Sequence, residues 1–127
     1  MKAYLLKTTG KPETLKIHEV PEPTTGKGEV KVKIKKIGIN YAEILSRKGY
    51  YSWAPKRPYI PGMESYGIIE EVGEGVSSER IGEKVIVGSQ YGNYAEKIVV
   101  NEKQALPHIE GFSEQENAAF IVNYLTA

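Results

Sequence analysis

Side chains that could bind or polarise a small molecule gather between residues 38 and 59. They combine an amide, a guanidinium and several aromatic groups: Asn40, Arg47, Tyr50, Tyr51, Trp53 and Tyr59. Hydrogen-bond donors beside aromatic faces suit a planar polar ligand. The same segment also has an ordinary structural interpretation, because Asn40 and Glu43 fit the N-terminal cap of a short helix. Residue types alone leave both interpretations open.

Residues for metal or nucleophile chemistry are scarce. The chain has no cysteine, which excludes disulfides, thiol nucleophiles and cysteine-based zinc sites. Its two histidines, His18 and His108, lie in separate segments without a partner at metal-ligand spacing. There is no GxGxxG motif, and the VGEGV segment at 72–76 fits a tight turn between strands better than a phosphate loop. We therefore expect no metal site.

Strands must position the polar cluster, because period-2 patterns dominate the chain. Strands are expected within 2–7, 14–20, 29–39, 65–76, 83–88 and 92–101. Residues 29–39 alternate valine or isoleucine with lysine, and the doubled Lys35–Lys36 predicts a β-bulge. The lysines of 31–36 indicate the solvated side of a strand, where they discourage edge pairing, with a polyanion-binding patch as the alternative. The run Val85–Val87 predicts burial on both faces.

Two helices complete the pattern. The first is expected to begin after Asn40, with Glu43 closing a capping box, and to end at Lys48 and Gly49. The second begins after Ser113 and runs to Ala127. It becomes more apolar toward its end and lacks a C-cap, so we expect it to continue in a longer protein.

Composition bounds the class of protein. The 127 residues are enough for one domain, and 17 basic against 16 acidic residues give a net charge of +1. That balance gives no reason to expect a nucleic-acid or membrane partner. No apolar run approaches the ~20 residues of a membrane span, and no signal peptide is recognisable, so we expect a cytoplasmic protein. The pattern predicts a mainly β domain, a closed or partly open barrel with one inserted helix.

Five segments, in order and spacing, resemble the zinc-independent quinone oxidoreductase branch of the medium-chain dehydrogenase/reductase superfamily. They are KAYLLKTTGKPETLKI, GEVKVKIKKIGINYAEILSRKGYY, PYIPGMESYGIIEEVGEGV, GEKVIVGSQYGNYAEKIVV and ENAAFIVNYLTA. The resemblance covers nearly the whole chain. It implies that residues 1–127 form the GroES-like catalytic domain, a distorted β-barrel whose C-terminal helix leads toward a Rossmann domain absent from this chain.

The resemblance also implies that both zinc sites of the related alcohol dehydrogenases are missing. Asn40 stands where those enzymes have a cysteine ligand. Their Gly-His-Glu motif reads Gly62-Met63-Glu64, so the histidine ligand is absent. A quinone or conjugated enone is already electrophilic, so hydrogen-bond donors can stabilise the developing oxyanion without a metal.

Site residues follow by the same resemblance. Asn40 and Thr126 match residues near the nicotinamide, and Tyr51 matches the tyrosine that closes an R-x-G-x-Y stretch beginning at Arg47. Glu43 stands where the branch often has aspartate. Asn40, Glu43, Arg47, Tyr51 and Thr126 are therefore expected on the substrate or nicotinamide side, with Asn40 and Thr126 as cofactor contacts. No residue is assigned a certain catalytic role.

The implied activity is NADPH-dependent hydride transfer to a quinone or conjugated carbonyl. Most cofactor contacts would come from the Rossmann domain, through which the full-length protein would form a homodimer. We therefore expect the isolated chain neither to bind NADPH tightly nor to turn over quinones.

Other functions fit the same motifs. One is an enone or enoyl-thioester reductase of this architecture, or a relative of the vesicle-amine-transport type. Another is a stand-alone GroES-like binding module, or a subunit that recruits a Rossmann partner in trans through the apolar residues 120–125.

Overall fold

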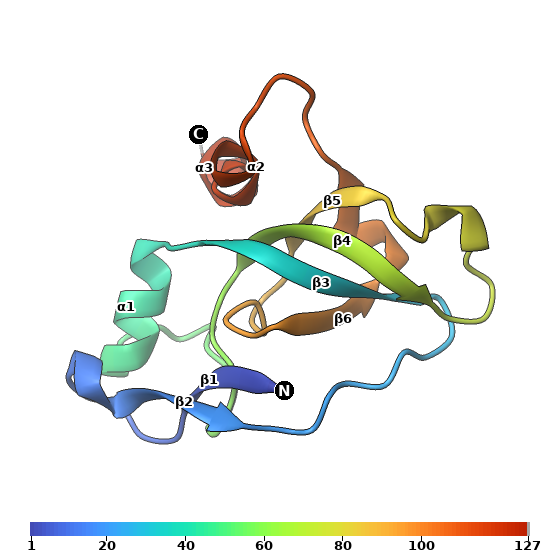
Figure 1. Ribbon diagram of the computed structural model, residues 1–127. Coiled ribbons are helices and arrows are strands. Elements are labelled where there is room, and N and C mark those ends of the chain that lie inside the picture. Colours follow the sequence, from blue (N-terminus) through green and yellow to red (C-terminus); the bar gives the residue numbers. More distant parts are fainter. Residues whose placement is uncertain (127) are drawn as a thin grey trace.

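A five-stranded antiparallel sheet and a two-stranded hairpin form most of the molecule (Figure 1). The computed structural model describes residues 1–126. The sheet has the order β6–β3–β4–β5–β7, and the hairpin pairs β1 with β2. The strands are β1 (Lys2–Leu6), β2 (Leu15–Glu19), β3 (Glu29–Gly38), β4 (Glu64–Val72), β5 (Lys84–Gly88), β6 (Lys97–Asn101) and β7 (Ala105–Pro107). This mainly β, curled half-barrel confirms the predicted fold class.

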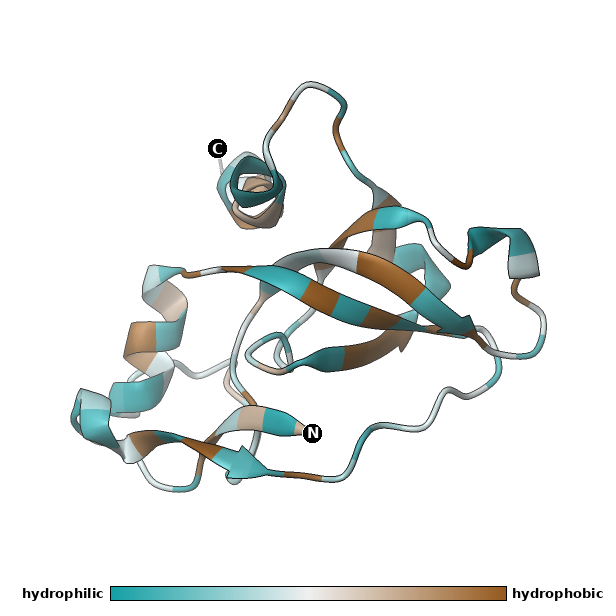
Figure 2. Cartoon of the chain, in the orientation of Figure 1, coloured by the Kyte–Doolittle hydropathy of each residue, from teal (hydrophilic) through white to brown (hydrophobic). Residues whose placement is uncertain are grey.

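The core of the sheet consists of short branched side chains. Brown and teal residues alternate along β3 in Figure 2, as expected for a strand with one face toward the core. Residues 85–87 of β5 are all buried, which confirms the prediction for that run. The cluster consists of Val30, Val32, Ile69, Val76, Val85, Val87, Ile98, Val100 and Ala105. The pairing of β3 with β4 continues beyond this cluster to Gly38 and Glu64, where the polar site begins.

The β-bulge predicted in β3 is present. The register against β4 shifts between Ile34 and Lys36, and a second irregularity lies between Lys31 and Val32. The extra, unpaired residue is Lys35 of β3 at the first of these shifts and Glu70 of β4 at the second.

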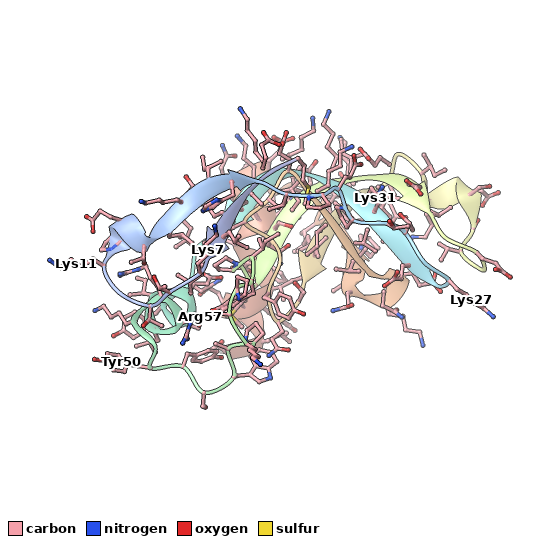
Figure 3. The ribbon with its side chains drawn as sticks, turned by 90° about the horizontal axis from the view of Figure 1, so that it is seen from below. Lys7, Lys11, Lys27, Lys31, Tyr50 and Arg57 are labelled. Atoms are coloured by element: carbon pink, nitrogen blue, oxygen red, sulfur yellow. The ribbon has the colours of Figure 1, made fainter. Side chains whose placement is uncertain are left out.

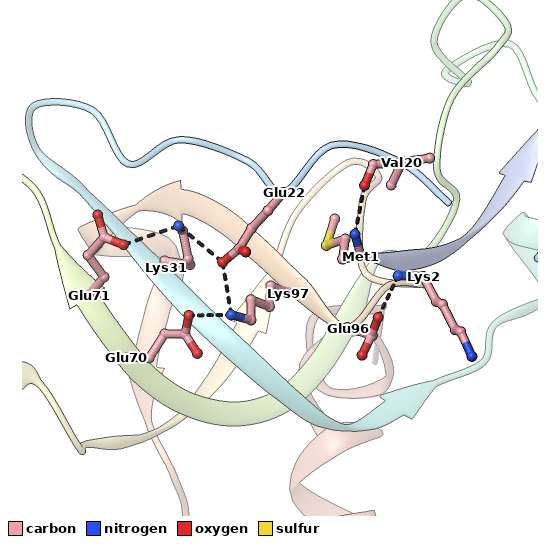
Figure 4. A network of polar contacts seen from close by, with 9 residues as sticks. All are labelled: Met1, Lys2, Val20, Glu22, Lys31, Glu70, Glu71, Glu96 and Lys97. Atoms are coloured by element: carbon pink, nitrogen blue, oxygen red, sulfur yellow. Dashed lines mark hydrogen bonds and ion pairs between the residues drawn. The ribbon is translucent and has the colours of Figure 1, made fainter. Parts of the chain in front are cut away.

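The predicted role of the β3 lysines is partly wrong. β3 lies between β4 and β6, so its lysines do not protect an edge. Lys31 is buried, and its ammonium lies 3.4 Å from Glu22 and 3.1 Å from Glu71 (Figure 4). The alternation could not reveal this, because Glu71 is the partner of Lys31 on the neighbouring strand β4 and Glu22 comes from the segment between β2 and β3. The lysines at 33, 35 and 36 are exposed as predicted.

The first helix matches its prediction. Helix α1 (Tyr41–Lys48) follows Asn40, and Gly49 ends it in a left-handed conformation with φ 87°. The Gly49 N–H donates to the last carbonyls of the helix, as a glycine C-cap does.

The second helix is interrupted. Ser113 and Glu116 form the predicted capping box, but α2 (Glu114–Ala118) and α3 (Phe120–Thr126) are separated at Ala119. Ala127, to which the helix was predicted to run, lies outside the described residues. Helix α2 packs on β3 and β4, on the side opposite the β1–β2 hairpin (Figure 1).

Shorter elements were not predicted. Three 3₁₀ turns, η1 (Pro12–Thr14), η2 (Ser78–Arg80) and η3 (Glu102–Gln104), connect strands, and β7 pairs with β5 over only three residues. Within residues 1–126, every helix is too short or too polar to cross a membrane.

Candidate functional site

Asn40 lies at the junction of β3 and α1. Its backbone is extended, with φ −127° and ψ 155°, so it ends the strand and precedes the first helical turn. Its side-chain Nδ2 donates to Glu64 Oε1 at 2.9 Å. Asn40 is therefore held by the first residue of β4 as well as by its own helix.

The Glu43 carboxylate gathers three donors from three elements. It accepts hydrogen bonds from the Asn40 N–H of its own cap, the Met63 N–H at 2.9 Å and the Tyr94 hydroxyl at 2.9 Å. Burial, together with the neighbouring carboxylate, raises the pKa of Tyr94 above its usual range. Glu43 is only 8% exposed, so these bonds fix α1 against the segment before β4.

Glu64 is a second buried carboxylate beside Asn40. It is fully buried, and its Oε2 accepts the Val122 N–H of α3 at 2.9 Å. Glu64 is not among the predicted site residues and enters the prediction only through the Gly62-Met63-Glu64 motif. One signal could have indicated it, because Glu64 is the only charged residue between Ile60 and Ile69.

The largest groove beside this network has a volume of about 650 Å³. Helix α3 forms one wall and the end of β5 another. Its lining combines apolar side chains with amides and hydroxyls: Trp53, Met63, Gly88, Ser89, Gln90, Lys103, Gln104, Leu106, Ile121, Val122, Leu125 and Thr126. Thr126 thus lies in the groove, where its hydroxyl donates to the Val122 carbonyl at 2.7 Å.

Tyr51 lies next to this groove. Its ring packs edge-on against Trp53, with centroids 6.5 Å apart. It lines a small neighbouring cavity that shares Met63 and Gln90 with the groove. The Gln90 side chain in turn donates to the Trp53 carbonyl, which ties the aromatic loop to the segment after β5.

Arg47 lies apart from Thr126. Its guanidinium donates to the Gly10 carbonyl, and its own carbonyl accepts the Gly10 N–H at 2.8 Å. It lines a different groove of about 400 Å³, between α1 and the β1–β2 hairpin. The structure therefore gives Arg47 a tethering contact between α1 and the turn of that hairpin.

The six polar and aromatic residues singled out first do not converge on one pocket. Tyr50 lies at the periphery of the molecule (Figure 3) and is 78% exposed. Tyr59 is buried and forms an isolated β-bridge with Leu6. Asn40, Tyr51 and Trp53 lie near the large groove. Asn40 is held there by Glu64 of β4, whereas Tyr51 and Trp53 pack against each other and are tied to the segment after β5 by Gln90.

The residues at the positions of the absent zinc ligands are poor ligands for that metal. Asn40 offers an amide that already binds Glu64, and Met63 offers a thioether. Among residues 1–126, no three His, Cys, Asp or Glu side chains are grouped so that they could hold a metal ion.

Comparison with known proteins places this geometry in a family. Residues 26–110 match the alcohol dehydrogenase GroES-like domain. The chain belongs to that family. It is an N-terminal domain type of the medium-chain dehydrogenase/reductase superfamily, as the sequence motifs predicted.

Relatives of this GroES-like domain include vesicle proteins and oxidoreductases. The zebrafish synaptic vesicle membrane protein VAT-1 homolog is 42% identical over 84% of the chain, and rat quinone oxidoreductase is 36% identical over 100% of it. The crystal structure of a Thermus thermophilus quinone oxidoreductase, also solved with NADPH, superposes with a TM-score of 0.83, 36% identity and coverage of 99% of this chain and 38% of that one. The chain spans 22% of the zebrafish relative and 39% of the rat enzyme.

Proposed function

We propose that this GroES-like domain is the substrate-side part of an NADPH-dependent oxidoreductase that reduces a quinone or conjugated carbonyl without zinc. The nucleotide-binding domain would be supplied in cis by a longer protein. The coverage of the relatives supports this, because each matched relative is more than twice as long as the chain.

One structural observation carries the proposal. The groove beside α3 joins the position of the missing zinc histidine, Met63, to Thr126, and Glu64 links it to Asn40. These are the residues that the family resemblance assigns to the nicotinamide or to the metal. Thr126 lies more than 60 residues after Asn40 and Met63 in the sequence, and folding brings the three segments close together.

The groove suits a nicotinamide ring. The apolar side chains of Met63, Ile121 and Leu125 can cover the face of a planar ring, while the amide of Gln90 can bond a carboxamide. Bound NADPH would supply the hydride, and the task of this chain would be to orient the ring and the acceptor. Thr126 and Met63 would form the nearest walls.

The acceptor would need hydrogen-bond donors in place of a metal. A quinone or enone spreads the negative charge that arrives with the hydride, so donors such as the Tyr51 hydroxyl and the Asn40 N–H that does not bind Glu64 could stabilise it. This assigns Asn40 and Tyr51 to substrate stabilisation and leaves Glu43 a structural role in holding α1. Arg47, which lines the other groove, has no part in it.

A titration of the isotope-labelled chain tests the proposal. Dihydronicotinamide mononucleotide is the probe, because it carries the ring without the adenosine that the other domain would bind. We expect chemical-shift changes at Met63, Gln90 and Thr126, and none at these residues with adenosine monophosphate. Changes confined to other parts of the chain, or none at saturating probe, would contradict the proposal.

The same reasoning gives an expectation for activity. The 127-residue chain alone lacks the walls that would hold the adenosine and the phosphates, so we expect no NADPH-dependent reduction of quinones above the buffer rate. Measurable turnover by the pure chain would show that the second domain is dispensable.

A further inference from the structure

Glu64 is an unusual residue for the interior of a β domain. Its carboxylate is fully buried at the start of β4, and no cation pairs with it in the described part of the chain. Its hydrogen-bond partners are neutral, the Asn40 amide and the Val122 N–H, each at 2.9 Å. An ion in such a place is costly to bury unless its hydrogen bonds are well made, so these two bonds determine how the carboxylate lies.

The first consequence concerns Asn40. An asparagine amide can present either its NH₂ or its carbonyl oxygen to a neighbour, and the two choices differ by a rotation of the side chain. A carboxylate can only accept hydrogen bonds, so it selects the NH₂. Glu64 therefore fixes the orientation of the Asn40 amide. One N–H faces the carboxylate, and the other N–H and the carbonyl oxygen are left for a ligand or another partner.

The second consequence concerns α3. In an uninterrupted helix the Val122 N–H would donate to the carbonyl of Ala118, four residues earlier. Here it donates to Glu64 instead, and the helix is interrupted at Ala119. The carboxylate thus occupies the first turn of α3, where exposed N–H groups and the helix dipole favour a negative charge.

Gly38 provides the space for this arrangement. A Cβ at Gly38 would lie 2.5 Å from the Ala118 carbonyl oxygen and 2.5 Å from Glu64 Cγ. Only glycine lets the end of β3, the Glu64 side chain and the end of α2 approach this closely.

We infer that Glu64 is a positioning residue that sets the Asn40 amide and the first turn of α3 in one fixed relation. Asn40 stands on the β3 side of the site and α3 forms a wall of the groove, so one carboxylate aligns both. The functional meaning rests on the proposed function of the groove, whereas the hydrogen-bond geometry does not.

The variant Glu64→Gln tests the inference on the 127-residue chain. A glutamine keeps the shape but has one acceptor oxygen. Either one of the two bonds is therefore lost, or the Asn40 amide rotates to present its carbonyl oxygen to the glutamine NH₂, and in both cases the present arrangement changes. We expect the Asn40 side-chain ¹⁵N–¹H signals to move toward those of a solvated asparagine, or the Val122 amide to exchange roughly tenfold faster or more. The control Glu70→Gln, on the same strand but paired with Lys97, should leave both signals unchanged.

Two outcomes would overturn the inference. One is a folded Glu64→Gln chain with unchanged Asn40 side-chain signals and unchanged Val122 exchange. The other needs no variant: wild-type Asn40 side-chain protons that exchange as fast as those of exposed Asn101, whose NH₂ donates no hydrogen bond within residues 1–126, would show that no fixed bond exists. The wild-type measurement decides the matter if Glu64→Gln does not fold.

The probe titration separates this inference from the proposed function. If dihydronicotinamide mononucleotide binds the groove of wild type and of Glu64→Gln equally well, and the Asn40 side-chain signals are the same in both, the positioning role fails and the proposed function stands. If the probe does not bind the wild-type chain but Glu64→Gln releases Asn40 or Val122, the positioning role stands and the proposed function fails. We expect binding to the wild-type chain and weaker binding to the variant.

Discussion

At the scale of single residues, two buried glutamates organise the site, and neither has an ion-pair partner within residues 1–126. Glu43 is satisfied by two backbone N–H groups and the Tyr94 hydroxyl. Such a carboxylate is stable only while its donors remain in place, because a buried charge that loses a hydrogen bond recovers no water. Tyr94 is the one donor that a conservative substitution can remove.

Tyr94→Phe should therefore destabilise the fold. The ring and its edge-on contact with Tyr4 are kept, but Glu43 loses a charge-assisted bond worth about 1.5–3 kcal/mol. Urea unfolding of both chains measures the difference in the free energy of unfolding. Tyr50→Phe is the control, because Tyr50 is exposed, and equal effects of the two substitutions would refute the role given to Tyr94.

The same variant has a pH signature. Burial and the Glu43 carboxylate raise the pKa of Tyr94 in the folded chain, whereas in the unfolded chain it titrates near 10. The folded state then binds the proton more tightly, so the stability from this group is present below pH 10 and is lost as the pH rises further. We expect the advantage of wild type over Tyr94→Phe to shrink above pH 10 in a series of unfolding experiments. An advantage that is constant across that range would contradict the assignment.

At the scale of elements, the local sequence pattern predicted those features that depend only on residues close together in the sequence. The β1–β2 hairpin, the bulge at Lys35–Lys36 and the capped helix α1 follow from alternation, a phase shift and an Asn/Glu/Gly arrangement. The interior position of β3, the burial of Lys31 and the interruption at Ala119 depend on partners far away in sequence. Nothing in the sequence around Glu71 or Glu64 indicates that these residues contact Lys31 or Val122.

Gly38 tests the packing of β3 against α2 and β4. Gly38→Ala should be strongly destabilising, because the new Cβ meets a backbone carbonyl and the buried Glu64 side chain at 2.5 Å. Gly88→Ala is the matched control, since its Cβ would meet only the Ile121 side chain at 3.3 Å. Thermal unfolding compares the two, and a midpoint for Gly38→Ala equal to that of Gly88→Ala would mean that α2 can move away freely.

Glu22 tests the polar network that covers β3 and β6. Its carboxylate accepts from Lys97 at 2.8 Å and also contacts Lys31 (Figure 4), and these two lysines, Lys97 first, lower its pKa below the usual 4.5. A lowered pKa in the folded chain gives stability that is present above about pH 4.5 and is lost as the pH falls below it.

Wild type should accordingly be more stable than Glu22→Gln at pH 7, by an amount that decreases as the pH falls below 4.5 and decreases with added salt. Glu13→Gln, in an exposed turn, serves as the control. A difference between wild type and Glu22→Gln that does not decrease as the pH falls below 4.5 would exclude the ion pairs as its cause.

At the scale of the whole molecule, the domain presents a groove and an uncovered helix on the same side. The α3 residues Tyr124 and Leu125 are 66% and 76% exposed, and Leu125 and Thr126 line the groove. Exposed apolar side chains beside a polar pocket are typical of an interface. Under the proposed function, a nucleotide-binding domain of the longer protein would cover this face and complete the site.

The sequence could identify the family, but not the spatial grouping of the residues that the resemblance assigns to the site. Thr126 lines the groove and Tyr51 lies beside it, while Arg47 binds the Gly10 carbonyl elsewhere. Spacing along the chain could not distinguish them, because Arg47 and Tyr51 are only four residues apart and their positions depend on a turn at Gly49.

The most direct test of the central claim uses the native polypeptide that carries this sequence, purified from its source at whatever length it has. NADPH oxidation is followed with a quinone as acceptor, before and after incubation with a strong zinc chelator. Our account predicts quinone-dependent oxidation that the chelator does not reduce. The absence of quinone-dependent oxidation, or its loss on chelation with recovery on addition of zinc, would contradict it.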